Sequence, residues 1–154
     1  MFETGSTFKI DSQGRVSFPT SYREYLLEQS NTDEPELWLA RPFTKNAHFI
    51  HGYGRTFYTK LERMLSKLNP YSREFHVLSS ITLGAAIKVK FDAQNRILLP
   101  KDLVEFANLK SEATYVGLGT QFQIWSQEEC AVNRETSLDE AEEKNYIEKL
   151  YWDG

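Results

Sequence analysis

The sequence predicts an α+β, β-rich protein in which a duplicated unit forms one barrel with pseudo-twofold symmetry, joined by a helical linker and ended by a C-terminal helix. Two observations predict this fold. The segment from Phe8 to Pro19 matches the segment from Val89 to Pro100 at a constant offset of 81 residues. Each unit of roughly 45 residues is too small to bury a good core alone, so we expect the two units to pair into a single body.

The matched segments read as a strand, a tight turn and a second short strand stopped by proline. Asp11 and Asp92 are expected to fold their carboxylates back onto backbone N–H groups two residues on. Gly14 and Asn95 stand where the turn needs a positive φ, which glycine adopts freely and asparagine tolerates best among the other residues. The turn chemistry is therefore the same in both copies.

The remaining elements follow in order along the chain. After each proline the pattern predicts a short helix, with Thr20 or Ser21 as the first N-cap. Two further strands complete each unit, and those of the second unit are expected to be joined by a tight turn around Gly117 and Gly119. The expected helices are 20–28, 55–68, 71–83, 101–108 and 127–150, with a break at Asn69-Pro70 and with Leu61, Met64, Leu65 and Leu68 on one face; the expected later strands are 36–41, 47–51, 113–117 and 121–125.

Composition excludes several classes of protein. The 154 residues weigh 17.9 kDa and are 40% apolar and 26% charged, which argues against wholesale disorder. No stretch approaches the apolar length of a membrane span, and the start Met1-Phe2-Glu3 does not resemble a secretory signal. One cysteine, Cys130, cannot form an internal disulfide, so a reducing cytoplasmic compartment is expected.

The net charge of −4 argues at first against nucleic acid as a partner. The acidity is local, however, because residues 126–154 hold nine acidic and three basic residues, a net −6. The other 125 residues hold 15 basic and 13 acidic residues, a net +2. A DNA-facing surface outside the tail is therefore still allowed.

The ordered set of motifs resembles the MraZ family, within the wider AbrB-like group. It comprises two copies of Asp-x-x-Gly-Arg or its near equivalent, each followed by apolar residues and proline, and the Met-Phe start. It also includes Leu83-Gly84-Ala85-Ala86 before the second copy and the ending Val-Gly-x-Gly with Phe-x-Ile-Trp between Val116 and Trp125. The resemblance covers nearly the whole chain and implies a duplicated swapped-hairpin, double-psi-like barrel.

Under this resemblance the chain divides into a first AbrB-like repeat (5–54), a helical linker (55–83), a second repeat (86–129) and an acidic C-terminal helix (130–154). The resemblance implies a bacterial transcriptional regulator on the nucleoid that binds repeated boxes upstream of the division and cell-wall gene cluster. It also implies closed rings of subunits. The family often has lysine where this chain has Gln13 and Gln94, and glycine where it has Asn95.

The family's Asp-x-x-x-Arg signature falls on Asp11 with Arg15 and on Asp92 with Arg96. An arginine just past a tight turn can present its planar guanidinium to a phosphate or to guanine O6 and N7. The alternative is a purely structural turn, in which the aspartate carboxylate caps the backbone and the arginine pairs with that carboxylate. The residues expected to contact DNA are Arg15 and Arg96, with Lys9, Gln13, Lys88 and Lys90 as supporting contacts.

Other candidate sites are weaker. His48 and His51 are expected on opposite faces of a strand, so no metal site is predicted. Cys130 stands among Glu128 and Glu129 and lacks a cation that would activate its thiol. Aromatic residues at core-like spacing are expected to pack rather than to stack on bases: Tyr22, Tyr25, Trp38, Phe49, Phe122 and Trp125.

The sequence thus predicts a sequence-specific DNA-binding regulator that forms a homo-oligomer, with no catalytic residue, metal, cofactor, membrane contact or small-molecule substrate. The alternative is an oligomeric interaction scaffold whose acidic C-terminal helix is the partner surface and which has no specific DNA. Salt-dependent, sequence-selective DNA binding would separate the two.

Overall fold

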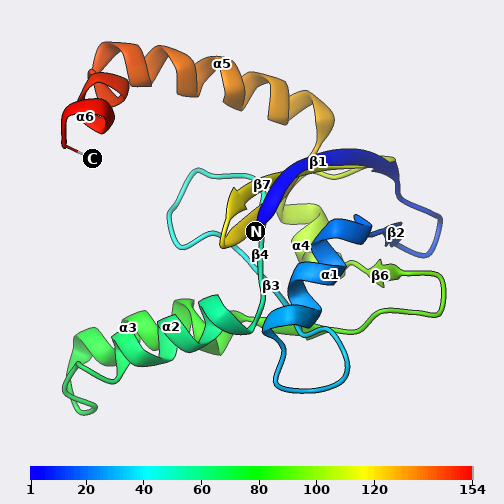
Figure 1. The fold of residues 1–154 in the computed structure, drawn as a ribbon, viewed down its shortest axis with the longest axis horizontal. Helices are drawn as coiled ribbons and strands as arrows, with labels where there is room; N and C mark the ends of the chain where they lie inside the picture. The colour runs from blue at the N-terminus through cyan, green and yellow to red at the C-terminus, as the bar shows by residue number, and fades with distance from the viewer. Residues whose placement is uncertain (154) are drawn as a thin grey trace.

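A computed structural model describes residues 1–153 and shows a β-rich body from which two helical arms project (Figure 1). The strands are β1 (Phe2–Lys9), β2 (Arg15–Ser17), β3 (Leu37–Ala40), β4 (Ile50–Tyr53), β5 (Ile87–Val89), β6 (Arg96–Leu98), β7 (Glu112–Gly119) and β8 (Gln121–Trp125). The helices are α1 (Thr20–Gln29), α2 (Arg55–Leu65), α3 (Arg73–Ile81), α4 (Lys101–Phe106), α5 (Gln127–Glu143) and α6 (Tyr146–Asp153), with a 3₁₀ turn at Leu83–Ala85.

Six strands form one antiparallel sheet in the order β1-β7-β8-β4-β3-β5, and β2 and β6 form a separate two-stranded ribbon. The mixed α+β, β-rich class predicted from the sequence is therefore confirmed. β1 pairs with β7 of the later segment, whereas β5 pairs with β3 of the earlier one. Such reciprocal pairing is what a swapped duplication would give; the duplication itself stays a prediction.

The strands that flank each turn hardly pair with one another. Single bridges, Ile10 with Val16 and Phe91 with Ile97, are their only ladder contacts within the described chain. Instead β2 and β6 pair with each other, with Val16 opposite Ile97. The ribbon is therefore built from segments about 80 residues apart, and its inner face is closed by these two buried side chains.

Aromatic rings dominate the core beneath the ribbon. Phe18 contacts the rings of Tyr22, Tyr115 and Phe122 in edge-to-face geometry, with centroids 5.6–5.9 Å apart. Both tyrosines satisfy their buried hydroxyls, since Tyr22 donates to the Glu3 carbonyl at 2.6 Å and Tyr115 to the Ser17 carbonyl at 2.9 Å. The Tyr115 bond ties β7 directly to the ribbon.

Several local expectations were wrong. The N-cap of α1 is Pro19 rather than Thr20 or Ser21, because the proline carbonyl accepts the amides of Tyr22 and Arg23 and no side chain caps the helix. Gly117 lies within β7 and not in a turn; a glycine is needed there because a Cβ would clash with the backbone of β1. Gly119, with φ +81°, ends β7 and leads through Thr120 into β8.

Two differences concern the helices. Met64, expected on one face with Leu61 and Leu65, is exposed, while those two leucines are buried. The acidic tail is two helices rather than one, because the chain turns at Asn145 with φ +55° between α5 and α6. Residue 154 of the expected helix lies outside the described residues. The division of the chain at residues 54, 83 and 129 stays a prediction.

Candidate nucleic-acid interface

The two turns are built by the same bonds. Asp11 Oδ1 accepts the amides of Gln13 at 2.9 Å and of Arg15 at 2.8 Å. Asp92 Oδ1 accepts the amides of Gln94 at 2.8 Å and of Arg96 at 2.9 Å. These carboxylates close the Asx turns that the sequence predicts.

The backbone of each turn adopts the expected positive φ. Gly14 has φ +86° and Asn95 has φ +58°. Asparagine at 95 adds a bond that glycine cannot make, because its Nδ2 donates to the Phe18 carbonyl at 2.9 Å. The second turn is therefore tied to the end of β2 by a side chain, whereas the first turn meets β6 through the Leu99 amide and the Gly14 carbonyl at 3.0 Å.

Each carboxylate also orients the arginine that follows it. Arg15 Nε donates to Asp11 Oδ2 at 2.8 Å, and Arg96 Nε donates to Asp92 Oδ2 at 2.9 Å. Among residues 1–153, the terminal nitrogens of both guanidinium groups make no hydrogen bond; Arg96 Nη1 lies 3.8 Å from Asp11 Oδ2 as an ion pair. One edge of each guanidinium is thus held, and the other edge is available to a ligand.

The ribbon places both arginines on one face. Arg15 pairs opposite Leu98, and Ser17 opposite Arg96, so these four side chains share the face away from buried Val16 and Ile97. The Arg15 and Arg96 side chains are 36% and 27% exposed. Sequence periodicity could not reveal this proximity, because it depends on pairing between the two distant copies.

Local hydrogen bonds set the electrostatics of the turns. The Arg15 amide, followed by its guanidinium and the Gln13 amide, lowers the pKa of Asp11 below its ordinary value. The Arg96 amide does the same for the pKa of Asp92, aided by Gln94 and the Arg96 side chain. Both carboxylates are therefore ionised at neutral pH and hold the arginines in place as charged groups.

A groove of about 710 Å³ lies between the first turn and β5. Its charged lining comprises Lys88, Lys90, Lys101, Lys110, Asp11 and Glu105, an excess of two positive charges. Sequence reasoning missed Lys101 and Lys110, because neither residue belongs to a recognisable motif in the sequence. Only the fold brings them to the groove that Gly14 also lines. They extend the basic surface next to the ribbon.

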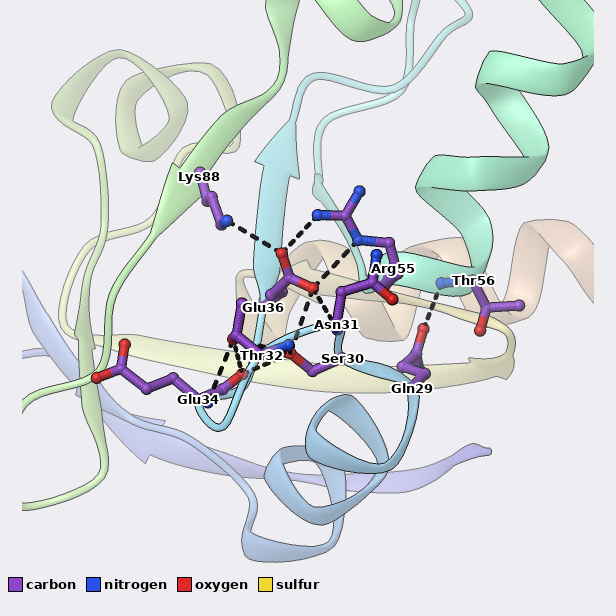
Figure 2. A network of polar contacts seen from close by, with 9 residues as sticks. All are labelled: Gln29, Ser30, Asn31, Thr32, Glu34, Glu36, Arg55, Thr56 and Lys88. Atoms are coloured by element: carbon purple, nitrogen blue, oxygen red, sulfur yellow. Dashed lines mark hydrogen bonds and ion pairs between the residues drawn. The ribbon is translucent and has the colours of Figure 1, made fainter.

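Lys88 differs from the other predicted cations. Its Nζ lies 3.1 Å from Oε2 of Glu36, a carboxylate only 3% exposed (Figure 2). The same Nζ lies 5.2 Å from the centroid of the Trp38 ring. Lys9 and Lys90 are exposed and form no ion pair within the described residues. The structure therefore turns the Lys88 ammonium toward an internal partner and leaves the other two toward solvent.

Comparison with known proteins shows the family to which this chain belongs. Residues 82–145 match a family model described as "MraZ protein, putative antitoxin-like". A protein named transcriptional regulator MraZ from Parvibaculum lavamentivorans is 40% identical over 119 residues, which span 77% of this chain and 71% of that relative. The chain belongs to the MraZ family. Another protein of this name, from Rickettsia canadensis, is 31% identical over 92% of this chain and 89% of its own length. A third, from Rickettsia bellii, is 34% identical over 75% of this chain and 74% of its own length.

The MraZ relatives are named regulators and not enzymes. The other candidate groups of this chain are His51 and Cys130. His51 is buried, its Nε2 lies 2.6 Å from Gln121 Oε1, and burial lowers its pKa. Burial raises the pKa of the Cys130 thiol, which keeps it protonated. Within residues 1–153, no cluster of three His, Cys, Asp or Glu side chains has metal-binding geometry, and no helix is long and apolar enough to span a membrane.

Proposed function

We propose that this protein is a sequence-specific DNA-binding transcriptional regulator that acts in the cytoplasm on the nucleoid. Its targets would be repeated promoter boxes upstream of the division and cell-wall gene cluster, engaged by several subunits of a ring. Family membership supports the regulatory class, since the curated relatives are named transcriptional regulators. The observation that carries the proposal is the pair of oriented guanidinium groups on one face of a two-stranded ribbon.

The ribbon suits the major groove of DNA. That groove is wide enough for a two-stranded β-ribbon, and guanine presents O6 and N7 there as paired acceptors. Arg15 and Arg96 each keep their terminal nitrogens for such a contact while Asp11 and Asp92 hold Nε. Preorganised arginines lose less rotamer freedom on binding, so the turns contribute to affinity as well as to position.

The surrounding lysines would bind phosphates without reading sequence. Lys9 and Lys90 are exposed, and Lys101 and Lys110 line the groove beside the first turn. We assign Lys88 a smaller share than the sequence predicts, because its ammonium pairs with Glu36, which also holds Arg55. One ribbon offers few base contacts, so simultaneous binding of several boxes by an oligomer would raise the effective affinity.

The test compares Arg15→Ala with Lys45→Ala by gel shift on the promoter of its own operon at moderate salt. Both variants lose one positive charge, but Lys45 is exposed in the loop between β3 and β4, outside the ribbon and both helical arms. We expect Arg15→Ala to bind about tenfold or more weakly, the loss of one bidentate base contact, and Lys45→Ala to bind as wild type. Arg15→Lys restores the positive charge but not the planar guanidinium group, so we expect its DNA binding to remain weak.

Equal weakening by Arg15→Ala and Lys45→Ala would mean that only overall charge matters, and the assigned role of Arg15 would be wrong. The scaffold alternative predicts no sequence-selective, salt-dependent binding by the wild type at all. A salt series on specific and scrambled DNA therefore decides between the two functions.

A further inference from the structure

The exposed apolar side chains of this protein are concentrated on the two helical arms. Twelve of the seventeen large apolar residues that are exposed in the described chain lie in residues 55–81 or 127–152. Monomeric proteins scatter such residues singly, whereas groups of them mark interaction surfaces. In Figure 1 both arms extend from the same side of the body, away from β2 and β6. The arms are thus separate from the proposed DNA face.

The C-terminal arm has a polar stem and an apolar tip. α5 is 17 residues long, about 26 Å of helix, and its apolar residues follow no single face. α6 carries Tyr146, Ile147, Leu150 and Tyr151 at positions i, i+1, i+4 and i+5, which form one face. Leu150 is 68% and the adjoining Trp152 82% exposed. A helix with this face needs a partner to bury it.

The linker arm offers a matching surface. α3 has no buried residue, and Val77, Leu78 and Ile81 form an exposed apolar face on it. Residues 55–81 hold five basic and two acidic residues, a net +3, whereas residues 126–154 carry a net −6. Opposite charges on two apolar arms favour contact between them and disfavour contact of either arm with its own kind.

We propose that the apolar face of α6 docks on the α3 face of a second copy of this chain, with acidic α5 beside the basic α2–α3 arm. Because the contact joins two different surfaces, it can repeat from one subunit to the next and close into a ring. This inference deepens the oligomer of the proposed function and rests on it. It names the segments that make the contact and leaves the ribbon of every subunit free for DNA.

The first test measures particle mass by light scattering at micromolar concentrations. We expect the wild type to be larger than the 17.9 kDa monomer. The double variant Ile147→Glu/Leu150→Glu should need about tenfold or more protein to assemble, since the removed side chains are the centre of the contact. The control Leu118→Glu alters a side chain that is 53% exposed on β7, outside both arms, and should assemble as wild type.

The second test reverses charge on the partner surface. Lys67→Glu/Arg73→Glu changes the net charge of residues 55–81 from +3 to −1. We expect weaker assembly than wild type, and the loss should shrink as salt rises because screening removes the repulsion. Unchanged assembly of either arm variant, or a monomeric wild type, would overturn the docking.

Cross-linking then distinguishes a second copy from the same chain. Val77→Cys and Leu150→Cys are made separately in a Cys130→Ser background and mixed under mild oxidation. A disulfide between these two variants, with a weaker product when Leu118→Cys replaces Leu150→Cys, supports docking between copies. No preference for the 77–150 pair would contradict it. None of these readouts uses DNA, so Arg15→Ala that assembles normally but fails in the gel shift keeps the two proposals separate.

Discussion

The carboxylates of Asp11 and Asp92 accept the same three hydrogen bonds, but their surroundings differ. Asp11 faces two guanidinium groups, its own Arg15 and Arg96 at 3.8 Å, whereas within residues 1–153 Asp92 pairs with Arg96 alone. Gly14 leaves the first turn without a side-chain tie, whereas Asn95 anchors the second to β2. The comparison teaches that one local motif, used twice, yields a more open Arg15 and a more restrained Arg96.

The strands that follow differ more strongly. Glu36 and Glu112 stand one residue before equivalent positions of β3 and β7, as their registers against β5 and β1 show. Glu36 is buried and accepts from Arg55 Nε at 3.1 Å, Lys88 Nζ at 3.1 Å and the Asn31 amide at 2.9 Å. Glu112 forms no ion pair among residues 1–153 and lies opposite Lys9. Only the first copy therefore clamps a helical arm to the sheet (Figure 2).

The largest expected effect is at this clamp. Glu36→Gln should lower the free energy of unfolding by about 2 kcal/mol, because Arg55 and Lys88 lose a charged acceptor. Glu112→Gln should change the free energy by less than about 0.5 kcal/mol, as for an ordinary surface substitution. Urea unfolding at neutral pH measures both. Equal losses would mean that the two copies are clamped alike, contrary to the geometry.

The next effect separates the two turn residues. Gly14→Ala should cost about 1.5 kcal/mol because alanine is strained at a positive φ, and Gly14→Asn should cost less. Asn95→Gly keeps the conformation but loses the bond to Phe18, which should cost about 1 kcal/mol. The same unfolding assay applies. A neutral Gly14→Ala together with a stabilising Asn95→Gly would contradict this division of roles.

The smallest effect is the pH dependence of the two carboxylates. Because folding lowers the pKa of Asp11 and of Asp92, their stabilisation is complete above the unfolded pKa of about 4 and is lost as pH falls through the folded pKa. Asp11→Asn should flatten the acid side of the stability profile more than Asp92→Asn, since Asp11 faces two arginines. Urea unfolding at a series of acidic pH values, with Glu112→Gln as a titration control, measures the difference. Steeper profiles in the variants would show the sign to be wrong.

Sequence reasoning succeeded where interactions are local. The Asx turns, the positive φ of Gly14 and Asn95, and the strand from Gln121 to Trp125 depend on neighbours along the chain. It failed for the N-cap at Pro19 and for Gly117, where contacts with the preceding residue and with distant β1 decide. Element type was predictable for most segments, whereas boundaries depended on packing.

The candidate site was also predictable only in its local features, and its spatial arrangement was not. Arg15, Arg96 and their carboxylates could be selected from the repeated motif, because the repeat and its turn chemistry are visible in the sequence. Their presence on one face could not, since antiparallel pairing of β2 with β6 joins segments about 80 residues apart. Capture of Lys88 by Glu36 and the approach of Lys101 and Lys110 to the first turn were equally invisible.

The amino-acid sequence by itself determined the turn geometry, the charge of each arm and the identity of the arginines, because these depend on residue type and on short spacing. Tertiary structure alone decided which cations stay exposed and which surface carries both guanidinium groups. The physical reason is that strand pairing and burial act between residues remote in the chain, and a side chain's partner and exposure exist only once those segments meet.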